Sequence, residues 1–258
     1  MSVISYLETR ASSAVLSSDE QASINTSIAT IKSRLNNYFG AALCEHLRFG
    51  SYTRGTILPR KMDQHSDIDY MVVFAEGGAV PQTYLDRLRR FADQHYSTSD
   101  IKQSSPSLVL QLNHIKFDLV PALKVWGTTY QIPNGSSAWQ YTNPNDFNWK
   151  LDTLNHNETY KIKPMIRLLK YWNAQADYVF DAYSLEKYVI NLSYYGKSNI
   201  RDYLFTAFDN IDLSSEQTQW RKDKLKRAKE IITAVRSLEL NGYPNLAEAE
   251  VKKLIPSD

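Results

Sequence analysis

The segment DIDYMVVF, residues 67–74, most constrains the fold because two carboxylates interrupt an otherwise apolar run. Side chains alternate between the two faces of a strand, so Asp67 and Asp69 share one face while Ile68 and Tyr70 point into a core. Like charges this close repel each other, and a hard cation such as Mg²⁺, which prefers oxygen ligands, would offset them. The stretch alone leaves two interpretations open, a metal site or a solvated strand face.

A third acid favours the metal site. In HIKFDLVPA, residues 114–122, Asp118 interrupts a second strand-like run, in which Ile115, Phe117 and Leu119 alternate as the apolar positions. We expect Pro121 to end this strand, since proline cannot donate to a sheet ladder. If the two strands are neighbours, the three carboxylates converge as ligands for two ions about 3.5–4 Å apart.

The pair Gly50-Ser51 follows a predicted strand, residues 47–50, and precedes a predicted helical turn. Glycine lets a phosphate group approach the backbone amides, and the serine hydroxyl adds a hydrogen-bond donor. A plain turn is the competing interpretation.

The predicted secondary structure changes along the chain, from mixed strands and helices in the first half to helices alone in the second, which indicates an α+β fold. A capping box at Ser17 and Glu20 predicts a long helix from about residue 18 to 39. We expect a first domain over residues 1–155 and a helical one over 156–258, with the boundary near residue 155. The other predicted elements are strands 67–74, 108–112 and 115–120, helices 81–95, 161–173, 184–195, 219–240 and 244–255, and a loop over 127–148.

Composition narrows the class of protein. The chain has 258 residues, 43% of them hydrophobic, with no apolar run long enough to span a membrane and no signal-peptide pattern at its start, so we expect a cytoplasmic protein without a membrane partner. The single cysteine, Cys44, excludes an internal disulfide and a cysteine-rich zinc site, and we expect it to be buried. A formal net charge of +2 does not require a nucleic-acid partner.

Taken together, FGSYTRGT, SDIDYMVVF and IKFDLVPA resemble the signature of the polymerase β-like nucleotidyltransferase superfamily. In the second half, IKPMIRLLKYWNAQ and AYSLEKYVINL are similar to the helical lobe of the cGAS/DncV-like nucleotidyltransferases and the oligoadenylate synthetases. The resemblance implies a nucleotidyltransferase sheet core with a long N-terminal helix, and a helical C-terminal lobe that completes a nucleotide cleft.

The activity implied by the resemblance is synthesis of a cyclic di- or trinucleotide second messenger from NTPs, ATP among them, in antiphage defence, with a downstream effector. Asp67, Asp69 and Asp118 match the catalytic metal triad, which holds two Mg²⁺ ions, with Mn²⁺ as a substitute. All three acids hold the first ion, and Asp67, Asp69 and the triphosphate hold the second. The positions that match triphosphate-binding residues are Gly50, Ser51, Lys170 and Ser184.

Two of these positions have other interpretations. On the helix from residue 161, Lys163, Arg167 and Lys170 lie opposite the apolar stripe, as a phosphate-binding face or as a solvated one. Ser184 is also a candidate N-cap for the next helix. Leu185 stands where some relatives have an aromatic residue that stacks on a base.

Nucleic acid is not required by this sequence. The zinc-binding insertion of animal cGAS is absent, as the single cysteine indicates. The basic run at residues 221–227 could bind nucleic acid, but the apolar stripe Leu225, Ala228, Ile232 and Val235 favours a solvated outer helix face. The remaining alternatives are addition of nucleotides to RNA ends, linear oligonucleotide synthesis, an antitoxin of nucleotidyltransferase type, and a catalytically inactive nucleic-acid-binding module.

Overall fold

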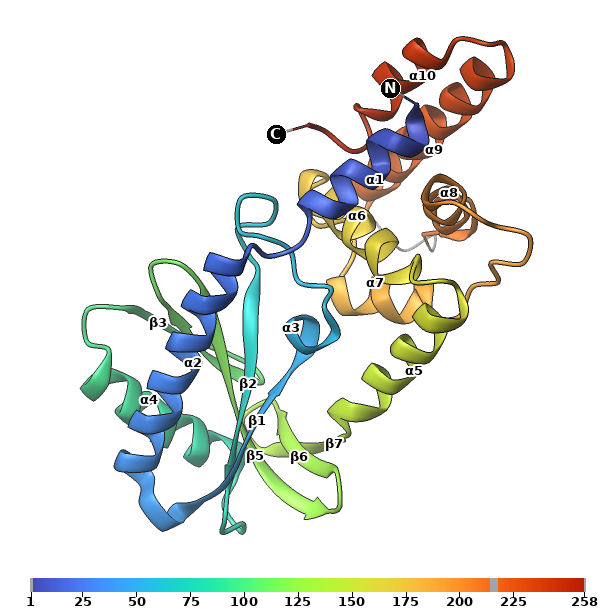
Figure 1. The fold of residues 1–258 in the computed structure, drawn as a ribbon. Helices are drawn as coiled ribbons and strands as arrows, with labels where there is room; N and C mark the ends of the chain where they lie inside the picture. The colour runs from blue at the N-terminus through green and yellow to red at the C-terminus, as the bar shows by residue number, and fades with distance from the viewer. Residues whose placement is uncertain (1, 214–217, 258) are drawn as a thin grey trace. The chain divides into compact units, whose positions relative to one another are not determined.

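The computed structural model describes residues 2–213 and 218–257, which form two compact units. One unit comprises residues 16–150, and the other joins residues 1–15 to residues 151–258. The expected division at residue 155 therefore differs from the observed one in the N-terminal segment, which packs with the helices that end the chain. Figure 1 shows the helices and strands of both units.

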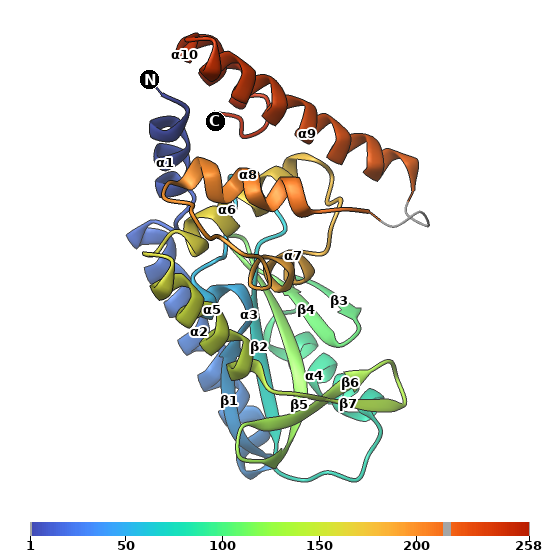
Figure 2. The ribbon, with the colours of Figure 1, turned by 90° about the vertical axis from the view of Figure 1, so that its right-hand side faces the viewer.

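The first unit is built on a mixed seven-stranded sheet in the order β1-β2-β5-β4-β3, with β6 pairing with β5 and β7 with β6. Strands β2 and β5 are parallel, and the other pairs are antiparallel. Figure 2 shows the β6–β7 hairpin extending from the end of β5. The strands are β1 Leu43–Phe49, β2 Asp67–Phe74, β3 Asp100–Ser104, β4 Ser107–Gln111, β5 Lys116–Trp126, β6 Thr129–Asn134 and β7 Ala138–Thr142.

Two long helices, α2 (Ser18–Phe39) and α4 (Pro81–His95), cover one face of this sheet. Both helices have the predicted bounds. The predicted capping box is present, with the Ser17 hydroxyl accepting from the Glu20 amide and the Glu20 carboxylate accepting from the Ser17 amide. The start of α2 is therefore fixed by a local feature of the sequence, the reciprocal hydrogen bonds of Ser17 and Glu20.

Residues at alternate positions of β2 bury one face of the sheet against α2 and α4. Ile68, Tyr70, Val72 and Phe74 belong to a single core cluster with the inward side chains of both helices. On the other face, Met71 and Val73 form a smaller cluster with Ala122 and Tyr130. Asp67 and Asp69 lie on this second face too, at the start of β2 and away from α2 and α4.

Three expectations for this unit are wrong. Strand β5 does not end at Pro121 but continues to Trp126; β4 pairs with β5 only as far as Leu119 and β6 only from Leu123, so Pro121 has a neighbouring strand on one side. The expected loop over 127–148 holds β6, β7 and the start of α5. Cys44 is exposed, because it lies on the edge strand β1.

The described part of the second unit is built from helices and the loops between them. Its core includes Met165, Leu168, Leu169, Leu204 and Phe208, all at most 1% exposed. No helix among residues 2–213 and 218–257 is long and apolar enough to cross a membrane. The α+β class predicted from the sequence is confirmed by the sheet and these helices together. Besides α2 and α4, the described residues of the two units form the helices α1 Val3–Ser13, the short η1 Gly40–Ala42, α3 Gly50–Arg54, α5 Pro144–Asn157, α6 Ile162–Gln175, α7 Ala182–Val189, α8 Ile200–Asn210, α9 Gln219–Leu240 and α10 Pro244–Val251.

Candidate active site

Three aspartates gather where the parallel strands β2 and β5 begin. In the register of the two strands, Asp69 lies directly opposite Asp118, and Asp67 lies opposite Lys116. Partners in a parallel register share a face, and so do residues two positions apart, so all three carboxylates stand on one face of the sheet. The condition stated for the sequence, that the two strands be neighbours, is met.

All three acids are partly buried. The side chains of Asp67 and Asp118 are 29% and 21% exposed. Ionised carboxylates in partly buried positions need compensation, because desolvation and mutual repulsion both disfavour the charged forms. The site is therefore arranged to attract positive charge.

Gly50 brings the backbone against this acidic face. Phe49, the last residue of β1, is the register partner of Asp69, so α3 starts directly beside that carboxylate. Gly50 has a φ of +71°, and a Cβ atom added to it would lie 1.6 Å from Asp69 Oδ2. Both the backbone conformation and the close approach require glycine here. Ser51 is the next residue of α3, and its carbonyl accepts from the amides of Thr56 and Ile57.

Two residues that the sequence analysis did not select contact the acids. The Lys116 ammonium lies 3.0 Å from Asp67 Oδ2 and 3.9 Å from Asp118 Oδ1. The Ser107 hydroxyl donates to Asp118 Oδ2 at 3.2 Å. Lys116 could have been found from the sequence, because it is two positions before Asp118 in the same strand and therefore shares a face with it. Ser107 gave no such signal, since its approach depends on the pairing of β4 with β5.

The environment of Asp118 disfavours its charged form. Burial, followed by the Asp67 carboxylate, raises the pKa of Asp118 to about 6, against the opposing effects of Lys116 and Ser107. Its Oδ1 atom is buried and has no hydrogen-bond partner among the described residues. A cation bound at Oδ1 would satisfy this oxygen and favour ionisation. The donor set, carboxylate oxygens on one face beside a buried unsatisfied oxygen, fits Mg²⁺ or Mn²⁺.

The acids do not enclose an ion as they stand. Within residues 2–213 and 218–257, no three His, Cys, Asp or Glu side chains are arranged closely enough to hold one metal ion. Lys116 lies between Asp67 and Asp118 and supplies the positive charge. Metal binding at this face would require the carboxylates to come closer together and Lys116 to move away from their oxygens.

Lys170 and Ser184 belong to the helical unit. The apolar stripe of α6 is buried as predicted, but Lys170 is buried too, at 7% exposed, with its ammonium 3.4 Å from Glu186 Oε1. The interpretation of this helix face as solvated is wrong for Lys170, because α6 packs against α1, α7 and α8 and is covered on more than one side. Its contact with a triphosphate stays a prediction.

The N-cap interpretation of Ser184 is also wrong. Asp181 caps α7, and its Oδ1 accepts from the Ser184 amide at 2.7 Å. Ser184 is the third residue of the helix and is exposed. Its hydroxyl is not engaged as a cap, and its role in triphosphate binding stays a prediction.

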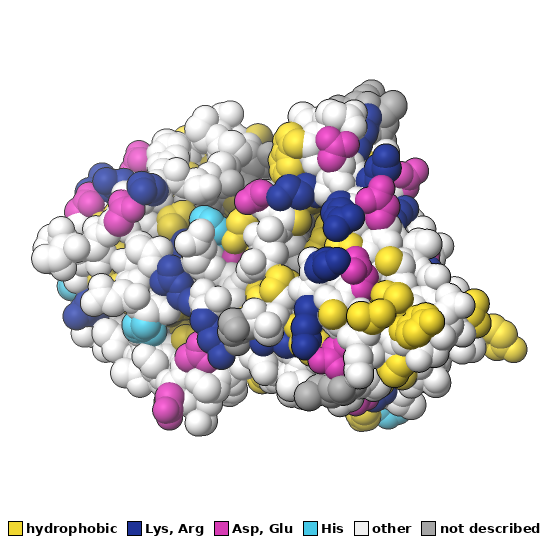
Figure 3. Space-filling model, turned by 90° about the horizontal axis from the view of Figure 1, so that it is seen from above, with side chains coloured by type: hydrophobic (Ala, Val, Ile, Leu, Met, Phe, Trp, Pro, Cys, Tyr) yellow, Lys and Arg dark blue, Asp and Glu magenta, His cyan; other side chains and the backbone are white. Residues whose placement is uncertain are grey.

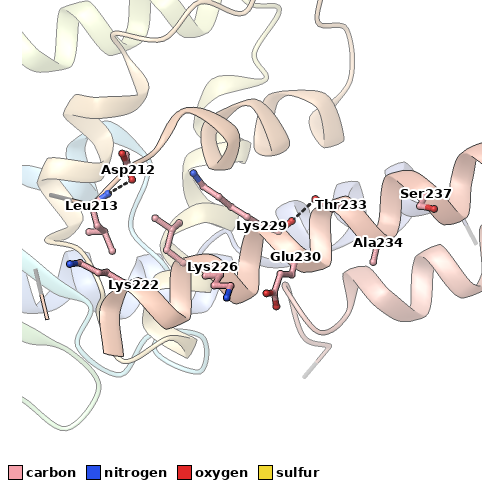
Figure 4. Close-up of a pocket in the computed structure, with 10 residues that line it drawn as sticks. Asp212, Leu213, Lys222, Lys226, Lys229, Glu230, Thr233, Ala234 and Ser237 are labelled. Carbon is pink, nitrogen blue, oxygen red and sulfur yellow. Dashed lines mark hydrogen bonds between the residues drawn. The ribbon is translucent and has the colours of Figure 1, made fainter. Parts of the chain in front are cut away.

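The basic run at residues 221–227 lies on α9, whose apolar stripe is buried as predicted. A groove of about 700 Å³ follows this helix, with Lys222, Lys226 and Lys229 beside Asp212 and Glu230 (Figure 4). In Figure 3, the Lys and Arg side chains of the face in view stand among acidic and uncharged ones. This mixture of charges is typical of a solvated surface.

Comparison with known proteins adds to the geometry. Residues 1–155 match the family model described as the Second Messenger Oligonucleotide or Dinucleotide Synthetase domain, SMODS. A curated relative, named a probable cyclic nucleotide synthase, of Bacillus cereus (strain VD146), is 26% identical over 186 residues, which cover 57% of this chain and 55% of the relative. The chain thus spans about half the length of that curated relative.

Solved structures resemble the whole chain. The structure of E. coli MS115-1 CdnC with ATP has a TM-score of 0.73 at 15% identity and covers 98% of both chains. Vibrio cholerae DncV cyclic AMP-GMP synthase, in complex with the linear intermediate 5′ pppA(3′,5′)pG, has a TM-score of 0.77 at 12% identity and covers 99% of this chain and 96% of that one. At these identities the likeness establishes the fold.

Proposed function

The chain belongs to the Second Messenger Oligonucleotide or Dinucleotide Synthetase domain family, and from that premise we propose that it joins NTPs into a cyclic di- or trinucleotide. The reaction is attack of a ribose hydroxyl on the α-phosphorus of an NTP, with pyrophosphate as the leaving group. Each joining step of this kind links two nucleotides, and a final intramolecular attack on the remaining 5′-triphosphate closes the ring and releases the last pyrophosphate. ATP is among the proposed substrates.

One observation carries this proposal: Asp69 faces Asp118 across two parallel strands, with Asp67 on the same face and Gly50 against Asp69. Phosphoryl transfer needs little covalent chemistry from a protein, because positioning and charge neutralisation supply most of the catalysis. An acidic face beside a glycine turn provides both, once cations are bound.

Each aspartate has a proposed role. Bound Mg²⁺ or Mn²⁺ would lower the pKa of the attacking hydroxyl and neutralise the charge that develops on the leaving pyrophosphate. Asp67, Asp69 and Asp118 would hold the ion at the attacking hydroxyl, and Asp67 and Asp69 would share the second with the triphosphate. Asp118 would then act on the nucleophile only.

The triphosphate would be bound by residues around this acidic face and by the helical unit. We assign Gly50 and Ser51 to the turn that the phosphates approach, and Lys170 and Ser184 to contacts from α6 and α7. Antiphage defence, an effector that binds the product, and a cytoplasmic location, where NTPs are made, belong to the same proposal.

Product analysis tests this function. Purified protein is incubated with each labelled NTP and with Mg²⁺ or Mn²⁺, with and without RNA, and then treated with phosphatase. We expect, in the absence of RNA, a labelled product whose chromatographic mobility does not change on phosphatase treatment, because a cyclic product has no terminal phosphate. Label in RNA would indicate addition to RNA ends, and an oligomer whose mobility changes because phosphatase removes its 5′-triphosphate would indicate a linear product.

Variants connect the product to the acids. Asp67→Asn and Asp69→Asn should each reduce product formation by about 100-fold or more, because they remove charge from the metal ligands. Asp93→Asn is the matched control, since Asp93 is an exposed acid that pairs with Arg89 on α4. Full activity in either triad variant would overturn the metal assignment.

A further inference from the structure

Lys116 lies where it can compete with a divalent cation. It starts β5, opposite Asp67 in the register, and so shares a face with the three aspartates. Its ammonium contacts Asp67 Oδ2 at 3.0 Å and lies 3.9 Å from Asp118 Oδ1. Gln111 lies opposite Lys116 on β4, but its side-chain amide donates to the Leu112 carbonyl and not to the aspartates.

The charge balance of this face depends on Lys116. Three carboxylates gather around one ammonium, and two of them are its direct partners. Removing that ammonium would leave like charges facing each other in a partly desolvated site. Lys116 therefore stabilises the face of the protein when no metal is bound.

A divalent cation and this ammonium cannot use the same oxygens together. Mg²⁺ binds carboxylate oxygens at about 2.0–2.1 Å, which is shorter than the 3.0 Å between the Lys116 ammonium and Asp67 Oδ2. A metal on that oxygen would therefore place two positive charges next to the ammonium and repel it. Of the oxygens that Lys116 approaches, Asp118 Oδ1 has no hydrogen-bond partner among the described residues. A bound metal would give this buried oxygen the partner that it lacks.

We propose that Lys116 is an internal counter-cation, which holds Asp67 and Asp118 in the metal-free protein and has to leave them before the metal binds. Metal binding at this face is then an exchange of cations, and its apparent affinity is lowered by the free energy of the lysine contacts. The inference rests on the proposed function, since it takes the three aspartates to be metal ligands.

Replacement of Lys116 by a neutral residue tests the exchange. Lys116→Met and Lys116→Gln should lower the thermal unfolding midpoint in EDTA and raise the affinity for Mn²⁺, measured by calorimetry without nucleotide. An increase of about tenfold is expected, which corresponds to removal of an interaction of about 1.4 kcal/mol. Lys116→Arg retains the charge and should bind Mn²⁺ as weakly as the wild type.

A lysine on the same strand provides the matched control. Lys124 lies on β5 and pairs with Glu45 at 2.8 Å, away from the three aspartates. Lys124→Met should leave the affinity for Mn²⁺ unchanged. Gains in Mn²⁺ affinity in both neutral Lys116 variants, and not in Lys124→Met, would support the exchange.

The outcomes separate this inference from the proposed function. If Mn²⁺ binding is lost in Asp69→Asn but is equally tight or weaker in both neutral Lys116 variants, the counter-cation role is overturned while the metal site stands. If neither the wild type nor those variants bind Mn²⁺, the metal site and the inference fall together.

Discussion

At the scale of single residues, Gly50 links the turn to the acids. A side chain at this position would occupy the space of Asp69, one of the three proposed metal ligands. Glycine therefore serves the site twice, by its positive φ and by its missing Cβ. The sequence suggested a phosphate turn, and the structure adds that this residue also makes room for a carboxylate.

Gly50→Ala should displace Asp69 and reduce product formation by about 100-fold, since a misplaced ligand costs much of the geometry that catalysis needs. Gly55→Ala is the matched control. Gly55 also has a positive φ, of +67°, yet its added Cβ would meet no described atom within 4 Å. It should cost roughly 1–2 kcal/mol of stability for the left-handed backbone and leave turnover unchanged. Equal losses of activity in both variants would contradict the role given to Gly50.

The raised pKa of Asp118 predicts how the stability of the metal-free protein depends on pH. With a pKa of about 6 in the folded protein and about 4 in the unfolded chain, Asp118 binds its proton more tightly when folded. Its contribution is therefore fully present below about pH 4 and is lost as the pH rises through about 6, with a magnitude of about 3 kcal/mol at most.

Asp118→Asn should remove this contribution. In EDTA, the free energy of unfolding of the wild type relative to the variant should fall between about pH 4 and pH 6 and level off above that range. Denaturant titrations at half-unit intervals of pH measure the difference. A difference that rises with pH over this window would show that the pKa of Asp118 is lowered in the folded protein.

At the scale of elements, the sequence predicts those whose signals are local. The capping box, the proline that starts α4 and the apolar run of β2 each lie within the element that they define, and the bounds of α2, α4, β2 and α9 agree with the predictions. The β6–β7 hairpin has a local signal only in its turn, Asn134-Gly135, a pair typical of hairpin turns that the expected loop over 127–148 did not take into account. Its strands alternate weakly in burial and hold a proline, Pro133, and β6 is held by pairing with β5.

In the candidate site too, some features follow from local sequence signals and others depend on how the elements pair and pack. Alternation along each strand predicts that Asp67 and Asp69 share a face and that Asp118 lies opposite the apolar positions of its own strand. The convergence of all three on one face follows from the pairing of β2 with β5. The contacts of Lys116 and Ser107 with those acids depend on the register of β2, β5 and β4, which a single sequence does not specify. The burial of Lys170 depends on how α6 packs, and a helical repeat shows one apolar face but not whether the other is covered.

At the scale of the whole molecule, the resemblance to the cGAS/DncV-like nucleotidyltransferases is confirmed by the family match and by the solved structures. The structure adds that the start of the chain belongs to the helical unit. Helix α1 packs against α6, α8 and α10, and the Tyr6 hydroxyl donates to the Ile255 carbonyl at 2.6 Å. The N-terminal helix thus packs against helices that begin at residue 162 or later in the chain.

This arrangement predicts which part of the chain a change in α1 will weaken. Leu7 is fully buried, so Leu7→Ala should cost about 2–5 kcal/mol. Hydrogen exchange measured by mass spectrometry should become faster in α6, α8 and α10 and change little in β2. Ile24→Ala is the matched control, because Ile24 on α2 is 3% exposed and packs in the core of the sheet unit. It should have the reverse effect, with faster exchange in β2. If Leu7→Ala accelerates exchange in β2 as much as in α6, the two units do not unfold separately and the assignment of α1 to the helical unit has no energetic meaning.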